Sequence, residues 1–498
     1  MNDTTKTALL IFSLALLFLS GVLFFISKSQ FDQTVGQIPE GSSIGSYPVG
    51  GADIASVLDA VQAIYESPIE LTYLGSRIQL QPKDLGFGLN REETLNRFNN
   101  ALAEASAGNT LLAYLFGQSH SEPVHSELIF TEDTDAVRSL LTDEIAPRYD
   151  RPAQAKQPAE DGTRFLPGHS GTALDAEAAV PLILEALRSD TDRSVELPVE
   201  EIPEPKAALV NLEIILRNVI DTWQDEGQVT EVYFSDPQTN EWFDIARRDR
   251  SDLIPEISFT AASTMKLPIM ISSYARMDEE PTPITQKMLR LMITESKNDQ
   301  TDWMMENIIG GEYAPLTVTE DMHLLGMKNS FLSGYFYLGA PLLALVETEA
   351  NTRTDVSLKP DVYNQTTPRD MGTLMDALYR CEANGDGLLF DVLPDQITQH
   401  ECEEMIQLLK DNHLPYLISA GVPDTVEVAH KHGWIEETDG LLHTMSNIGA
   451  VYSPGGDYIL SIYTYHPENL IFDEGNTLFS QISAAVYDYF NPTAAEED

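Results

Sequence analysis

Ser263 and Lys266 are the residues whose types and spacing most directly indicate chemistry in this chain. They follow a strand-like stretch at 257–260 and stand three positions apart, so a helix that begins near Ser263 presents both side chains on one face. A serine is a poor nucleophile until a base takes its proton, and a neutral buried lysine can take it. A helix N-terminus also favours negative charge that develops nearby. The pair therefore predicts nucleophilic catalysis at Ser263.

Two further motifs carry polar groups that suit the same chemistry. Ser296-Lys297-Asn298 follows an apolar helix predicted over 288–293, and Lys431-His432-Gly433 is predicted to open a strand. A cation at Lys431 can hold a substrate carboxylate. Glycine lets the strand backbone come close, so that an amide can serve in an oxyanion hole. Ser-x-x-Lys occurs only at Ser263 and Lys-x-Gly only at Lys431, so we expect one site built from three segments.

The elements that must position these motifs lie within residues 207–492. The pattern predicts an amphipathic helix over 209–223, two strands, a helical middle, three late strands and a final helix from about residue 475 to 490. The strands are expected at 230–235, 242–246, 433–437, 443–452 and 458–465. This order predicts an α/β (α+β) fold, with an antiparallel sheet covered by helices.

The N-terminus contains 19 uncharged, mostly apolar residues at 8–26, which is about the length of a membrane-spanning helix. A cleaved signal peptide is the alternative, but no small-x-small cleavage site follows. We expect residues 1–30 to form a cytoplasmic stub and an uncleaved anchor. The protein is then a single-pass protein of the cell membrane, and the bulk of the chain is extracytoplasmic.

Residues 41–205 contain a helix and a strand in two similar copies. Asp53 and Asp175 each stand where a helix N-cap is needed, and in both copies helical periodicity gives way to strand alternation. The stretch 151–162 is predicted to be a hinge, and the Pro-rich stretch 198–205 a linker. These residues are expected to form a small duplicated α+β domain.

Composition and cysteine usage narrow the function. A net charge of −48 excludes a nucleic-acid partner, which would need clustered basic residues, and argues against docking on an anionic lipid surface. Neither HExxH nor CxxC occurs, so no metal and no cofactor are expected. Cys381 and Cys402 are predicted either to form a disulfide or to be two buried thiols.

Over residues 207–492 the chain resembles class A β-lactamases and penicillin-binding proteins. The resemblance rests on the three motifs and on supporting stretches at 291–296, 325–327, 366–371 and 447–452. It implies that Ser263 is the acylated nucleophile and Lys266 its general base. It also implies that Ser296 relays a proton to the leaving group, that Asn298 binds the substrate amide and that Lys431 binds its carboxylate.

The same resemblance places the oxyanion hole at the backbone N–H groups of Ser263 and Trp434. Lys297 stands where class A enzymes usually have Asp, and the 33-residue interval from Ser263 to Ser296 is short, so part of the wall over the site is expected to be missing. His432 replaces the usual Thr or Ser, which predicts pH-dependent carboxylate binding.

The resemblance also calls for a deacylating carboxylate. Glu347 is the candidate, from a Glu-x-x-x-Asn pattern that precedes Thr-Thr-Pro at 366–368. Without such a glutamate an acyl-enzyme hydrolyses slowly, as in a penicillin-binding protein.

Residues 41–205 resemble the peptidoglycan-binding domain found ahead of L,D-transpeptidases and in vancomycin-resistance W-type proteins; a structural spacer is the alternative. The two resemblances together imply a serine hydrolase that acts outside the membrane on β-lactams or on D-alanyl peptides of the cell wall. The alternative is a catalytically inactive peptidoglycan-binding or sensor protein of the cell envelope.

Overall fold

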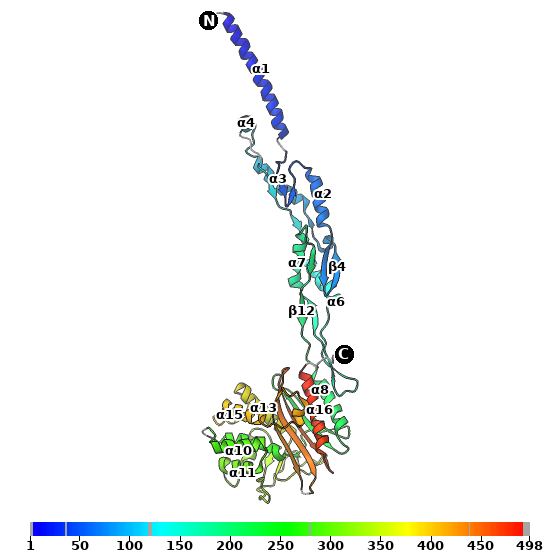
Figure 1. The fold of residues 1–498 in the computed structure, drawn as a ribbon, viewed down its shortest axis with the longest axis vertical. Coiled ribbons are helices and arrows are strands. Elements are labelled where there is room, and N and C mark those ends of the chain that lie inside the picture. Colours follow the sequence, from blue (N-terminus) through cyan, green and yellow to red (C-terminus); the bar gives the residue numbers. More distant parts are fainter. Residues whose placement is uncertain (1–2, 35–36, 118–121, 278–279, 438, 492–498) are drawn as a thin grey trace. The chain divides into compact units, whose positions relative to one another are not determined.

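The computed structural model describes residues 3–34, 37–117, 122–277, 280–437 and 439–491 (Figure 1). Two compact units make up the chain. Unit 1 consists of Met1–Ala153 and Ser170–Pro203, and unit 2 of Gln154–His169 and Glu204–Asp498. The predicted hinge at 151–162 therefore contributes most of its residues to unit 2, where β8 (Gln157–Pro158) pairs with β9 (Phe165–Leu166).

Helix α1 (Asp3–Thr34) contains the predicted anchor segment. Within the described residues it is the one helix whose length and apolar composition suffice to cross a membrane, over Thr4–Gln33. Its apolar side chains between Leu9 and Ile26 are largely exposed, so the helix has no protein core of its own to enter.

In unit 1 the two predicted helix–strand copies join one small sheet. Asp53 caps α2 (Ile54–Tyr65) by accepting a hydrogen bond from the Ser56 N–H, and Asp175 caps α7 (Ala176–Arg188) in the same way from Ala178. The strands that follow, β3 (Ile69–Tyr73) and β11 (Ser194–Glu196), pair in parallel, and β4 (Ser76–Leu80) pairs with β3. The apolar faces of both helices pack on this sheet.

The Pro-rich stretch predicted as a linker is partly a strand. β12 (Val199–Ile202) pairs with β10 (Gly171–Leu174), because the prolines flank residues 199–202 and leave their N–H groups free to pair. The other elements of unit 1 are β1 (Ser43–Ile44), β2 (Tyr47–Pro48), β5 (Gly88–Leu89), α3 (Arg91–Ser106), α4 (Leu111–Leu115), β6 (His125–Ser126), β7 (Phe130–Thr131), α5 (Thr134–Ser139) and α6 (Ala146–Tyr149).

The predicted mixed fold with an antiparallel sheet covered by helices is confirmed in unit 2. Six strands, each antiparallel to its neighbours, form the sheet in the order β15-β14-β13-β21-β20-β19. The inner strands are rich in β-branched and aromatic residues and are buried on both faces, as a central sheet requires. The six are β13 (Val229–Asp236), β14 (Glu241–Arg248), β15 (Ser251–Leu253), β19 (Glu427–Glu436), β20 (Leu442–Tyr452) and β21 (Tyr458–Tyr465).

Helices cover both faces of this sheet (Figure 1). On one face lie α8 (Leu209–Trp223) and α16 (Phe472–Phe490), close to the ranges predicted for the first and last helices. The other face carries the helical middle of the unit. Its helices are α9 (Lys266–Tyr274), α10 (Pro283–Thr294), α11 (Asn298–Met304), α12 (Ala314–Leu324), α13 (Pro368–Asn384), α14 (Leu388–Val392) and α15 (Gln399–Lys410).

Three short elements complete the region around the predicted motifs. Strands β16 (Phe259–Thr260), β17 (Phe331–Leu332) and β18 (Asn364–Thr366) form a small sheet in the order β16-β18-β17. After β16 the chain enters a 3₁₀ turn, η3 (Ala262–Met265), and α9 follows directly.

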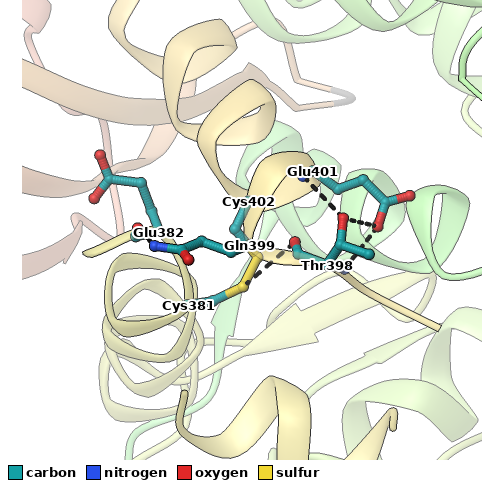
Figure 2. The surroundings of a disulfide bond; sticks show 6 residues. All are labelled: Cys381, Glu382, Thr398, Gln399, Glu401 and Cys402. Carbon is teal, nitrogen blue, oxygen red and sulfur yellow. Dashed lines mark hydrogen bonds between the residues drawn. A yellow bond between two sulfur atoms is a disulfide. The ribbon is translucent and has the colours of Figure 1, made fainter. Parts of the chain in front are cut away.

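Cys381 and Cys402 form a disulfide between α13 and α15 (Figure 2). Both residues are fully buried. Beside the bridge, Thr398 and Glu401 make a capping box at the start of α15, and the Gln399 side chain donates to the Glu382 carbonyl oxygen. The start of α15 is therefore fixed to α13 by covalent and polar contacts together.

Removing this disulfide in a Cys381→Ala/Cys402→Ala variant should destabilise unit 2. The bridge closes a loop with a sequence separation of 21 residues, and the chain-entropy estimate for such a loop is about 3 kcal/mol. We expect the unfolding temperature of unit 2 to fall by several degrees. Thermal unfolding with and without reductant measures this: the reductant should lower the unfolding temperature of the wild type but not that of the variant. Equal unfolding temperatures for the two proteins without reductant would contradict the prediction.

Candidate active site

The structure brings Ser263 and Lys266 together across the 3₁₀ turn. The Lys266 Nζ lies 2.7 Å from the Ser263 Oγ. In a 3₁₀ turn, residues i and i+3 are nearly eclipsed, which suits this pair at least as well as the α-helical start expected from the sequence. Ser263 is partly exposed, whereas Lys266 is fully buried, so the amine reaches the hydroxyl from the protein side.

The second motif supplies the other oxygens around the same amine. Lys266 Nζ donates to the Ser296 carbonyl oxygen at 2.8 Å and to the Asn298 Oδ1 at 2.9 Å, and it lies 3.2 Å from the Ser296 Oγ. A charged amine has three N–H groups, so it cannot donate to all four oxygens at full strength; a neutral amine has two and a lone pair. The lone pair can then accept the Ser263 O–H.

Burial changes the acidity of Lys266. Loss of solvent lowers the pKa of its amine from the usual value to about 7, and the buried carboxyl of Asp302 opposes this shift. A substantial fraction of the amine is therefore neutral near pH 7, which is the form that can take a proton.

The third motif places a second buried amine, that of Lys431, against the Ser296 hydroxyl. Lys431 Nζ donates to the Ser296 Oγ at 2.9 Å and to the His432 carbonyl oxygen at 3.0 Å. Burial, together with the nearby Lys266, holds the pKa of Lys431 well below its ordinary value. The Ser296 hydroxyl thus lies between two amines that disfavour each other's charge. Lys431 stands in the middle of β19 and does not open the strand as predicted, because pairing with β20 begins at Glu427.

Gly433 allows β19 to approach the turn that holds Ser263. A Cβ at this position would lie 3.0 Å from the Ala261 carbonyl oxygen, 3.1 Å from the Thr264 Cγ2 and 2.7 Å from the Ser446 Oγ. Any side chain would push the edge strand away from η3. β19 is also the edge of the sheet, so alternate N–H groups along it face away from β20.

Two residues beside the Ser263–Lys266 pair hold a left-handed backbone that non-glycine residues rarely adopt. They are Ala262, with φ of 48°, and Ser296, with φ of 57°. The Ala262 N–H donates to the Asn364 Oδ1 at 2.7 Å, and the Lys266 amine bonds the Ser296 carbonyl. Such strained residues concentrate at functional sites because surrounding contacts must hold them in place.

His432 does not have the environment that the resemblance implies. Its ring stacks on Trp434 with a centroid distance of 4.5 Å, and its Nδ1 lies 3.3 Å from the Asn412 Nδ2. Burial and the neighbouring Lys431 lower the pKa of His432 to about 2, so the ring is neutral at ordinary pH. The expected pH-dependent carboxylate binding therefore has no support from His432.

Glu347 does not join the site either. Its side chain is exposed, and across the described part of the chain it forms no hydrogen bond or ion pair with Ser263, Lys266 or Ser296. Its loop is held elsewhere, by Asn351 contacts to the Val346 carbonyl and to Gln365. No contact of Glu347 among the described residues supports the deacylating role, which stays a prediction.

Two residues near Lys266, Asp302 and Phe336, were not predicted from the sequence. The Asp302 Oδ1 accepts the Phe336 N–H at 2.8 Å, and the Phe336 ring centroid lies 5.3 Å from the Lys266 Nζ. Asp302 is buried and follows Asn298 by four positions on α11, so its helical spacing was an available signal. Phe336 is in a loop of aromatic residues and gave no such signal.

Ser263, Asn298 and Trp434 open onto a cavity of about 700 Å³. This volume suits a small molecule or a short peptide segment. Its remaining wall contains the aromatic residues Tyr335, Phe336, Tyr337 and Tyr363 and the charged residues Lys359, Asp361, Glu436 and Glu437.

A cluster elsewhere in unit 2 has ligand types that can bind a metal. Potential ligand atoms of Glu280, His400 and Glu404 lie within 4.8 Å of one another. Two of these three side chains are exposed, and His400 already pairs with Glu280 at 3.9 Å and with Glu403 at 3.5 Å. Ion pairing accounts for this cluster, and we assign it no metal.

Comparison with known families bears on unit 2. The model of the β-lactamase enzyme family matches residues 282–490, which include Ser296, Asn298 and Lys431 and begin 19 positions after Ser263. Over that stretch the chain carries a β-lactamase-family domain, and the predicted resemblance is confirmed there.

Solved structures similar to this chain come from the same group of proteins. PBP-A is 18% identical with a TM-score of 0.40, over 57% of this chain and 98% of its own. A β-lactamase from Sphaerobacter thermophilus DSM 20745 is 17% identical with a TM-score of 0.40, over 56% and 96%. A class A β-lactamase from Bacteroides cellulosilyticus DSM 14838 is 16% identical with a TM-score of 0.41, over 56% and 97%. Such identities say nothing about activity. No curated protein matches the chain.

Proposed function

We propose that this protein is a membrane-anchored serine hydrolase that forms an acyl-enzyme at Ser263. The single observation that carries the proposal is the 2.7 Å contact between the Ser263 Oγ and a buried Lys266 amine whose pKa is lowered to about 7. A neutral amine at hydrogen-bond distance from a serine hydroxyl is the arrangement that activates such a nucleophile. The β-lactamase-family match over 282–490 supports the same reaction class.

The proposed substrates are β-lactams or D-alanyl peptides of the cell wall, bound in the 700 Å³ cavity. Ser263 attacks the amide carbonyl while its proton passes to Lys266, and backbone N–H groups of Ser263 and Trp434 stabilise the oxyanion. The C–N bond then breaks, and the proton that Lys266 took from Ser263 passes through the Ser296 hydroxyl to the leaving nitrogen. Asn298 orients the substrate amide.

Lys431 is proposed to bind the substrate carboxylate. In the free protein burial and the nearby Lys266 lower its pKa, and an anion close to the amine acts in the opposite direction.

The wall above Lys266 favours a long-lived acyl-enzyme. Among the described residues Lys266 donates to no carboxylate; the Phe336 ring centroid lies 5.3 Å from its Nζ, and the Asp302 Oδ1 accepts the Phe336 N–H. We therefore favour penicillin-binding or peptidase behaviour over rapid β-lactam hydrolysis. The extracytoplasmic location follows from these substrates together with the α1 helix.

A labelled penicillin should form a lasting adduct at Ser263. Intact-mass analysis of the full chain followed by peptide mapping locates the adduct. Ser263→Ala should abolish labelling, whereas Ser251→Ala, at an exposed serine of the same unit, should leave it unchanged. A wild-type protein that takes up no label under any condition would instead support the catalytically inactive wall-binding or sensor protein.

The acylation rate should rise with pH through about 7. The active form of Lys266 is the neutral one, and its pKa of about 7 means that protonation removes the base as the pH falls. Labelling rates of the full chain between about pH 5 and 9 measure this. Lys266→Ala should slow labelling by about 10²–10⁴-fold. In the His432→Gln variant the labelling rate should fall with decreasing pH as it does in the wild type, because His432 is neutral over this range. Loss of that fall in the variant would show that His432, and not Lys266, causes the pH dependence.

Phe336→Glu should shorten the life of the adduct. A carboxylate in place of the ring stands close enough to Lys266 to activate a water molecule against the acyl ester. Release of the label over time measures this, with Phe336→Gln as the uncharged control of the same shape. Equal release from both variants would show that charge at this position does not limit deacylation.

A further inference from the structure

Helix α4 exposes apolar side chains that no part of the described protein covers. Leu112 is 68% exposed and Phe116, directly after the helix, is 73% exposed; Leu115 is exposed as well. Residues 107–117 include no charged side chain, in a chain of which 22% is charged. Exposed apolar side chains gathered in this way mark a contact with another apolar phase.

The position of α4 beside α1 indicates what this apolar phase is. Tyr114 of α4 packs on Phe31 of α1, with ring centroids 5.6 Å apart, and both helices belong to unit 1. The apolar run of α1 ends at Ile26, and Phe31 lies five residues beyond it. At a rise of about 1.5 Å per residue the ring pair stands about 7–8 Å beyond the end of the hydrocarbon-spanning segment. The polar layer of a bilayer is roughly 5–8 Å thick on each side, so α4 is at the height of the lipid head groups.

We propose that α4 is a second membrane contact, with Leu112, Leu115 and Phe116 inserted in the interfacial layer of the bilayer that α1 spans. This rests on the membrane anchoring included in the proposed function. The binding partner is the lipid surface itself. Because the segment has no basic residues, the contact does not require anionic lipid and is insensitive to salt. Two contacts restrict the rotation of unit 1 about α1 more than a single helix does.

Site-directed spin labelling of the full chain in phosphatidylcholine vesicles tests the proposal. The two native cysteines are joined in a buried disulfide, so a single introduced cysteine is the one label site in the absence of reductant. Labels go at Leu17→Cys in α1, at Leu112→Cys and Phe116→Cys in or beside α4, and at Ile254→Cys as a control. Ile254 is an apolar residue of unit 2 and is 72% exposed, nearly the same as Phe116. Collision rates with oxygen, which concentrates in lipid, and with a water-soluble nickel chelate report the environment of each label.

We expect labels at Leu17, Leu112 and Phe116 to favour oxygen over the nickel chelate, with Leu17 the deepest, and the Ile254 label to favour nickel. These values should be the same in low and in high salt. A lipid-exposed Leu17 with water-exposed α4 labels would overturn this inference and leave the anchor intact. A water-exposed Leu17 would overturn the anchor itself. α4 labels shielded from both reagents would show a protein contact, which also overturns the proposal.

Discussion

The burial of the Lys266 amine is the constraint on which the rest of unit 2 depends. An amine out of water is unfavourable when charged, and its pKa falls unless polar groups surround it. The fold surrounds the buried amine with oxygens from two segments far apart in sequence, Ser263 and Ser296 to Asn298. Those oxygens hold the amine in place without restoring its full charge.

The strong acidity of the chain bears directly on the pKa of Lys266. The protein has 78 acidic residues, yet within the described part of the chain Asp302 is the carboxyl whose charge raises the pKa of Lys266. The Asp302 Oδ1 accepts the Phe336 N–H, and the Phe336 ring centroid lies 5.3 Å from the Lys266 Nζ. Burial outweighs this one carboxyl, so the pKa of Lys266 falls to about 7 and part of the amine is neutral near that pH.

The edge strand β19 joins the two halves of the site. Lys431 and Gly433 lie on the same side of the strand because they are two residues apart, so one delivers an amine to Ser296 while the other permits contact with η3. His432 and Trp434 share the opposite side and stack on each other. Burial on that side, together with the neighbouring Lys431, lowers the pKa of His432.

The residue patterns alone predicted the elements and the motif residues that local rules govern. Strand alternation located β13, β20 and β21, aspartates at helix starts located α2 and α7, and the uncharged run located α1, because each signal depends on neighbours in sequence. Spacing also predicted the Ser263–Lys266 pair. The tertiary structure decided which distant groups surround that pair. It placed Phe336 and Asp302 near Lys266, stacked His432 on Trp434, and joined Cys381 to Cys402. The pKa of a side chain and the identity of its neighbours depend on residues that pack nearby from other segments. Spacing along the chain does not predict those contacts.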